Sequence, residues 1–183
     1  MKVLVAQHGA GTTAVTLMAD SALLRTGRAM YLPEFVHTMV AAPAVIARID
    51  RLGKHIAPRF ARRYWKEVTT GFRLLACDQH GEPLAPAEAA LNSFDGAALQ
   101  GDYPASMADD TLAWAHNGTT LCRTTLGEVA QEIDEVVVRV SQFATLKMGD
   151  LIFLVMEPRA PLSIGDRLSG TTGGETTLTT AIK

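Results

Sequence analysis

The chain has 183 residues, of which 48% are hydrophobic and 20% are charged, a composition typical of one globular domain that can bury a core without disulfides. Its formal net charge of −2 gives no overall attraction for nucleic acid or an anionic membrane, so neither partner is expected. No apolar run approaches the roughly 20 residues that a membrane-spanning helix needs. We therefore expect a single cytoplasmic domain over residues 1–183.

Two cysteines, Cys77 and Cys122, lie far apart in the sequence and form no CxxC pair. Metal binding through thiolates is not expected, and a reducing compartment is the default, although one disulfide bridge stays open. The apolar start of the chain is soon interrupted by Gln7, His8 and Gly9, which argues against a signal peptide.

The first part of the chain predicts strands separated by loops, with one helix. The helix begins at Pro58 and runs for about three turns, because Phe60, Tyr64 and Val68 recur at every fourth position. Strands are expected at Lys2–Ala6, Ala44–Ile49 and Gly71–Asp78. The segment Ser21–Val36 predicts a hairpin followed by an irregular loop. A further loop is expected over Gln79–Glu88, and one short helix within Ala85–Leu91.

The last third of the chain carries sharper signals. Asn117-Gly118 between two strand-like runs predicts a tight hairpin, because both residues tolerate positive φ. Thr125 and Glu128 fit a capping box before an amphipathic helix from Leu126 to Phe143. A Gly-Asp turn at Gly149-Asp150 then leads into a buried strand, Leu151–Val155. A second Gly-Asp turn follows at Gly165-Asp166, and the tail of the chain predicts one more strand. The sum is an α+β, β-rich fold with two main helices.

Composition and spacing alone select no catalytic site. The five histidines form no HExxH pair, Ser93 and Ser141 lack a GxSxG elbow, and Gly9–Gly11 is too short for a dinucleotide fingerprint. The acidic residues of the predicted C-terminal helix lie away from its valine stripe, as expected of a solvated face.

The segment from Asn117 to Gly170 resembles the fumarylacetoacetate hydrolase (FAH) family. An Asn-Gly hairpin, a helix ending near a serine, an L-x-x-GD turn, a buried strand and a second GD turn occur in the family's order. The resemblance extends upstream to Asp20–Arg28, to Arg48–Phe72 and to Ser93–Gly96, although the N-terminal region is short and the segment of the catalytic His loop is missing. Arg48 and the RLGK run that begins at Arg51 anchor the comparison of individual positions. The resemblance implies one domain of the FAH C-terminal type, with mixed sheets and two main helices.

The resemblance also implies where the chemistry should lie. FAH enzymes act on oxo-acids with a bound Mg²⁺, Mn²⁺ or Ca²⁺, which a Glu-x-Glu strand and an Asp on the next strand hold. In this chain those positions fall on Ala42, Ala44 and Arg73. A family lysine falls on Asn92, and the family's TGTP loop becomes Val155–Pro158, which contains Glu157. No metal ligand and no cofactor are therefore expected.

Three functions follow from these replacements. The favoured one is a catalytically inactive FAH-like protein that acts as a binding or partner subunit, in a homodimer, in a hetero-oligomer with an active paralogue, or with a small anionic ligand near Arg73. The alternative is an oxo-acid hydrolase or lyase with a rebuilt site that uses Glu157, Asp95, His37 and Arg73. A plainer interpretation of Arg73 within this alternative is an internal ion pair that replaces cohesion through a metal. The third is a structural or interaction protein without a ligand. Pro43 removes a ladder donor, which predicts an edge strand or a bulge there.

Overall fold

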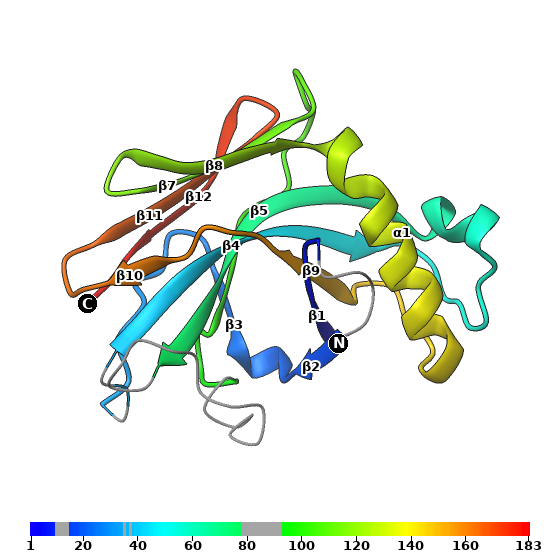
Figure 1. The fold of residues 1–183 in the computed structure, drawn as a ribbon, viewed down its shortest axis with the longest axis horizontal. Coiled ribbons are helices and arrows are strands. Elements are labelled where there is room, and N and C mark those ends of the chain that lie inside the picture. Colours follow the sequence, from blue (N-terminus) through cyan, green and yellow to red (C-terminus); the bar gives the residue numbers. More distant parts are fainter. Residues whose placement is uncertain (10–14, 35, 37, 78–92) are drawn as a thin grey trace.

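Two β-sheets and one long helix form the protein, as the computed structural model shows for residues 1–9, 15–34, 36, 38–77 and 93–183 (Figure 1). The larger sheet comprises β1 (Val3–Gln7), β2 (Val15–Met18), β3 (Leu23–Arg25), β4 (Thr38–Ile49), β5 (Trp65–Cys77), β6 (Ala98–Gln100), β9 (Leu151–Val155) and β10 (Ala160–Leu162). The smaller, antiparallel sheet comprises β7 (Thr111–His116), β8 (Thr119–Thr125), β11 (Arg167–Thr172) and β12 (Glu175–Ala181). The helical segments are η1 (Asp20–Ala22), η2 (Pro58–Tyr64) and α1 (Leu126–Phe143).

The larger sheet is mixed and curls into a roll. Its strand order is β2-β1-β9-β4-β5-β6-β3, with β10 pairing β4 as well, and β1–β9 and β3–β6 are the parallel pairs. Its two edge strands, β2 and β3, are joined through η1, so that the edges approach each other below β1 in Figure 1. The inward face of β4 and β5 therefore looks into the roll.

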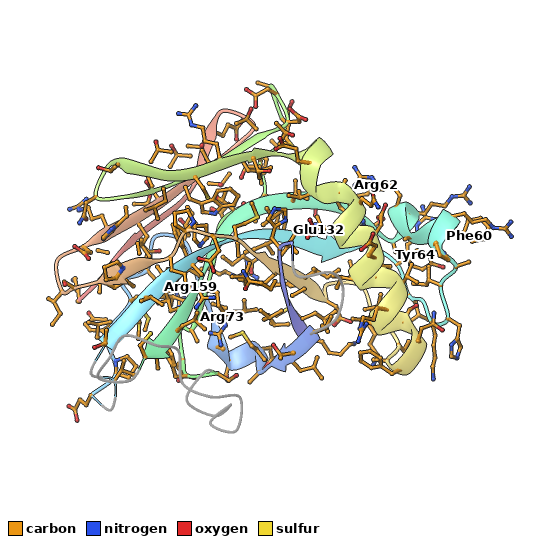
Figure 2. The ribbon with its side chains drawn as sticks, viewed as in Figure 1. Phe60, Arg62, Tyr64, Arg73, Glu132 and Arg159 are labelled. Carbon is orange, nitrogen blue, oxygen red and sulfur yellow. The ribbon has the colours of Figure 1, made fainter. Side chains whose placement is uncertain are left out.

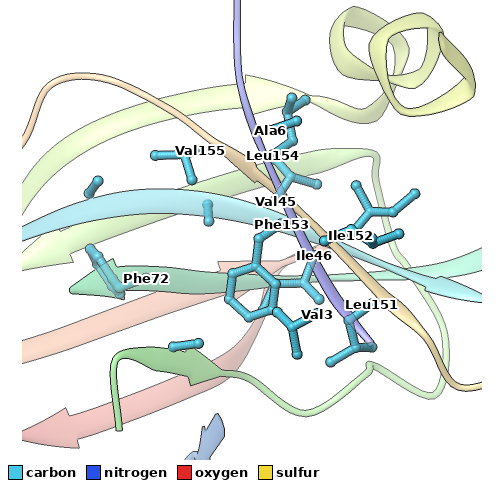
Figure 3. Close-up of a cluster of buried hydrophobic side chains, with 14 of the residues drawn as sticks. Val3, Ala6, Val45, Ile46, Phe72, Leu151, Ile152, Phe153, Leu154 and Val155 are labelled. Carbon is cyan, nitrogen blue, oxygen red and sulfur yellow. The ribbon is translucent and has the colours of Figure 1, made fainter. Parts of the chain in front are cut away.

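The long pair of β4 and β5 forms the centre of the molecule. The two strands are antiparallel from Thr38 opposite Cys77 to Ile49 opposite Trp65, with one register shift after Arg48. β4 is buried on both faces, as expected of a central strand. The side chains of β9 pack among those of β1, β4 and β5 in a dry hydrophobic cluster (Figure 3).

The smaller sheet packs on the outer face of β5. The indole nitrogen of Trp114 donates a hydrogen bond to the carbonyl oxygen of Gly71 at 2.8 Å. The hydroxyl of Thr70 lies 2.9 Å from that of Thr177 on β12. Gly170 on β11 is needed at this contact, because a Cβ there would collide with the Thr70 side chain.

Several predicted elements of the C-terminal third are confirmed. The helix α1 spans Leu126–Phe143, and its capping box is complete: the Thr125 hydroxyl accepts from the Glu128 amide while the Glu128 carboxylate accepts from the Thr125 amide. The hydrogen bonds that the Glu128 carboxylate accepts, first from the Thr125 amide and then from the Thr124 hydroxyl, lower the pKa of Glu128. The hairpin turn has Asn117 at φ 50° and Gly118 at φ 79°. The strand Leu151–Val155, both Gly-Asp turns and the N-terminal strand are also present.

The predicted helix from Pro58 to Val68 is wrong in type and extent. It is a 3₁₀-helix that ends at Tyr64, and β5 begins at Trp65. Val68 instead pairs with Ala47 of β4. The fourfold spacing of apolar residues was a local signal, and non-local pairing with a buried strand outweighs it.

The hairpin predicted over Ser21–Val36 is also wrong, because β3 pairs in parallel with the distant β6 rather than with a neighbour in sequence. The loop and short helix predicted between Gln79 and Leu91 lie outside the described residues. The α+β, β-rich class itself is confirmed, with α1 and η2 as its two longest helical segments.

The expected edge or bulge at Pro43 is a further correction. Pro43 lies inside β4, opposite Phe72 of β5, and the register shift falls elsewhere. On its other side, β9 pairs with β4 only from Ala44 onward, and β10 pairs with it only up to Ala41. The carbonyl oxygen of Pro43 accepts a hydrogen bond from the Met156 amide at 2.7 Å, so its missing N–H faces the break between β9 and β10.

Candidate functional site

The pairing of β4 with β5 brings the three predicted site positions together. Ala42 lies directly opposite Arg73, and Ala44 lies opposite Gly71. Paired residues and residues two apart on a strand share a face of the sheet. Ala42, Ala44 and Arg73 therefore form one continuous patch on the inward face of the roll, and this patch is called the alanine–arginine site.

The surroundings of this site are small, apolar and buried. Ala42 and Ala44 are fully buried, and Arg73 is 5% exposed. The next strand outward on each side places Val155 opposite Ala44 and Ala98 opposite Arg73. These neighbours are hydrocarbon side chains and offer no ligand to a hard cation.

The Arg73 guanidinium is held by backbone oxygens. Its Nη1 donates hydrogen bonds to the carbonyl oxygens of Leu74 at 2.7 Å and Ala97 at 3.0 Å. Burial lowers the pKa of Arg73 to about 10, so the group keeps its positive charge at neutral pH. The contact with Ala97 ties β5 to the segment that leads into β6.

A second arginine, Arg159, flanks the site on the other side. It directly precedes Ala160, which pairs with Ala41, so its register position is beside Ala42. Its guanidinium pairs with the Glu157 carboxylate at 3.0 Å, and the two side chains are 34% and 56% exposed. Figure 2 draws Arg73 and Arg159 at the same end of β4.

The residues at the site do not fit a divalent cation. Two methyl groups and a guanidinium provide no oxygen ligand where the resemblance places three carboxylates. Within the described parts of the chain, no group of three His, Cys, Asp or Glu side chains lies close enough together to hold a metal ion.

The other predicted residues lie in different places. Glu157 follows β9 and points to Arg159 rather than to a cluster of carboxylates. Asp95 is exposed and lines a separate hollow of about 630 Å³ with Met30 and Tyr31. His37 and Asn92 lie outside the described residues.

Sequence reasoning did not find Arg159 or the carbonyl partners of Arg73. The position of Arg159 depends on the pairing of β10 with β4, and that of Ala97 on the loop before β6. Both contacts join segments that are distant in sequence, and no local pattern indicates them.

No protein-family model matches the chain, and no curated protein matches it. Solved structures match its whole length. Fumarylpyruvate hydrolase from Pseudomonas aeruginosa, solved in complex with Mn²⁺ and pyruvate, has a TM-score of 0.80 at 17% identity over 100% of this chain and 89% of that chain. A Yersinia pestis CO92 protein provisionally assigned to the fumarylacetoacetate hydrolase family has a TM-score of 0.79 at 16% identity over 100% and 92%. This chain has the FAH fold.

A third matching structure is that of an isomerase rather than a hydrolase. It is 5-carboxymethyl-2-hydroxymuconate delta-isomerase from Mycobacterium smegmatis, with a TM-score of 0.78 at 21% identity over 99% of this chain and 78% of that chain. At these identities the likeness shows the fold and leaves the chemistry of this chain to its own residues.

We expect Arg73→Leu to lower the free energy of unfolding by about 2 kcal/mol, because it removes a buried donor from the carbonyl oxygens of Leu74 and Ala97, of which the latter keeps the Leu74 amide at 2.8 Å. Urea denaturation measures the change. The control is Arg123→Leu on the exposed side of β8, where a change within about 0.5 kcal/mol is expected. Equal stability of the two variants would contradict a structural role for Arg73.

Proposed function

We propose that this chain keeps the FAH fold without metal-dependent catalysis, and acts as a binding or partner subunit. The observation that supports it is the direct pairing of Ala42 with Arg73 on the inward face of the roll, with Ala44 on the same face. The resemblance to the FAH family assigns the metal ligands to these three positions.

Electrostatics supports the proposal at the same place. Arg73 stays positively charged at neutral pH despite its burial. A further positive charge about 4 Å away would be repelled by about 4 kcal/mol per unit charge at an effective dielectric constant of 20. A divalent cation would experience twice that repulsion, and the side chains at positions 42, 44 and 73 supply no carboxylate to offset it.

Arg73 also offers a reason why the scaffold can persist without a metal. Its hydrogen bond to Ala97 joins β5 to the chain that enters β6, across the inward face of the roll. A metal held between neighbouring strands would provide a comparable link. Direct hydrogen bonding thus replaces coordination as the cohesive contact.

Arg159 supports an anionic ligand as the bound molecule. Its side chain is one-third exposed beside Ala42, and its partner Glu157 is more exposed still. A small carboxylate that displaces Glu157 would pair with the Arg159 guanidinium, at the end of β4 that also carries the buried charge of Arg73. In a second version of the proposal, the protein instead binds a partner subunit, which is another copy of the chain or an active paralogue.

The alternative is an oxo-acid hydrolase or lyase with a rebuilt site, and a turnover assay separates the two. With oxaloacetate and acylpyruvates as substrates, and with Mg²⁺ or Mn²⁺ added, we expect no rate above that of the buffer. An authentic fumarylpyruvate hydrolase assayed in parallel is the positive control. Metal-dependent turnover by this chain would overturn the proposal.

Restoring the acids should restore metal binding. The variant Ala42→Glu/Ala44→Glu/Arg73→Asp places three carboxylates on one face, so we expect Mn²⁺ to raise its melting temperature. The matched control Ala42→Gln/Ala44→Gln/Arg73→Asn has nearly the same shape and no charge, and Mn²⁺ should leave its melting temperature unchanged. A folded acidic variant that ignores Mn²⁺ would show that these positions are not the equivalents of the family's ligands.

A further inference from the structure

One short part of the chain is strongly basic although the whole carries a net charge of −2. Residues 51–66 contain six Lys and Arg side chains and no carboxylate, whereas the rest of the chain has eleven Lys and Arg against nineteen Asp and Glu. The six cations are Arg51, Lys54, Arg59, Arg62, Arg63 and Lys66. Five of them lie on η2 and on the loop before it, and Lys66 lies at the start of β5.

All six cationic side chains are exposed. Lys66 approaches Asp50 at 3.5 Å, and none of the other five takes part in an ion pair within the described residues. Nearby carboxylates are engaged elsewhere: Glu67 pairs with Arg48, and Asp134 accepts the indole N–H of Trp65 at 2.7 Å. The positive charge of this segment is therefore largely uncompensated.

The loop before η2 is fixed to the end of α1. Gly53 and Leu146 exchange two backbone hydrogen bonds, at 2.8 and 3.0 Å. The amide of Ile56 donates to the Ser141 hydroxyl at 2.9 Å. Gly53 also packs so closely on the Tyr64 ring that a Cβ there would collide with it, which couples the loop to η2.

The arginines of η2 are ordered on aromatic rings. The guanidinium carbon of Arg62 lies 3.8 Å from the centre of the Trp65 ring, and Arg59 and Arg63 lie 4.8 and 5.0 Å from that of Phe60. Figure 2 shows Phe60 and Arg62 at the outer edge of the molecule beside α1. Stacking holds these cations in place while their charge faces solvent.

Large apolar side chains lie beside these cations. Leu52, Phe143 and Met148 are 68%, 61% and 72% exposed. Leu52 and Met148 are neighbours because residues 49–53 run alongside 146–149, through hydrogen bonds at Gly53–Leu146 and Ile49–Gly149, and Phe143 ends α1 three residues before Leu146. Residues 136–148 contain Arg139 and Lys147 and no carboxylate, and Lys147 directly precedes Met148. The six cations, Lys147 and these three apolar residues are together called the basic edge.

We propose that the basic edge docks this protein on an anionic phospholipid surface. A bilayer offers both complements at once, because phosphate and carboxylate headgroups attract the cations while Leu52, Phe143 and Met148 enter the interface. Peripheral docking needs no spanning segment, and no helix among the described residues is long and apolar enough to cross a membrane.

A nucleic acid fits the same surface less well. Phosphates would pair with the arginines, but the faces of Phe60 and Trp65 that bases would stack on are covered by guanidinium groups. Exposed aliphatic side chains such as Leu52 and Met148 gain nothing from a phosphate backbone. The combination of charge and aliphatic surface therefore favours lipid.

The test is co-sedimentation of the full chain with vesicles of phosphatidylcholine plus phosphatidylserine, and of phosphatidylcholine alone. Binding is expected only to the anionic vesicles, and should weaken as salt is raised. The variant Arg51→Gln/Lys54→Gln/Arg59→Gln should bind about a hundredfold more weakly, because each basic side chain near the surface contributes about fivefold. Leu52→Ser/Phe143→Ser/Met148→Ser should bind at least about tenfold more weakly with its charge unchanged.

The matched control is Arg28→Gln/Arg123→Gln/Arg167→Gln, which removes the same charge from exposed positions outside the basic edge. It should retain binding within about threefold. Circular dichroism and melting temperature verify that each variant is folded. Equal losses in control and test variants, binding to phosphatidylcholine alone, no binding to anionic vesicles, or binding to single-stranded RNA without binding to vesicles would each overturn the proposal.

Discussion

The antiparallel pairing of β4 with β5 is the constraint on which the rest of the structure depends. The two strands run side by side over almost their full length, and β4 is buried on both faces. A slip by one residue would turn every side chain to the other face. Gly71 helps to prevent it, because any side chain there would collide with Ile46 and with the carbonyl oxygen of Leu99. The register that places Ala42 opposite Arg73 is thus enforced by packing far beyond the site itself.

The same constraint explains how the fold accommodates two alanines and an arginine at positions 42, 44 and 73. The backbone of the roll is set by ladders between β1, β9, β4, β5 and β6, whose hydrogen bonds join main-chain groups rather than side chains. Alanines fill the confined space at two of the three positions. At the third, Arg73 donates hydrogen bonds to the carbonyl oxygens of Leu74 and Ala97 and keeps its charge inside the roll.

What the sequence could predict depended on how local each signal was. Capping by Thr125 and Glu128, the valine stripe of α1, and the Asn117-Gly118 turn all act within a few residues, and all are present. The helix expected through Val68 and the edge expected at Pro43 failed because distant strands decide both places. The net charge of the whole chain did not indicate the basic edge, because the excess of Asp and Glu in the rest of the chain outweighs the six Lys and Arg of residues 51–66. The resemblance to FAH proteins anticipated the fold, and it located three positions that the structure places side by side.

Mn²⁺ binding to the unmodified chain decides whether the alanine–arginine site holds a metal. Electron paramagnetic resonance reports free Mn²⁺ as a six-line signal, which weakens when the ion is bound to protein. With Ala42, Ala44 and Arg73 at the site, we expect the signal to stay undiminished at protein concentrations up to about a millimolar. A saturable loss of signal, equivalent to one Mn²⁺ per chain and abolished by changes at these positions, would contradict this expectation.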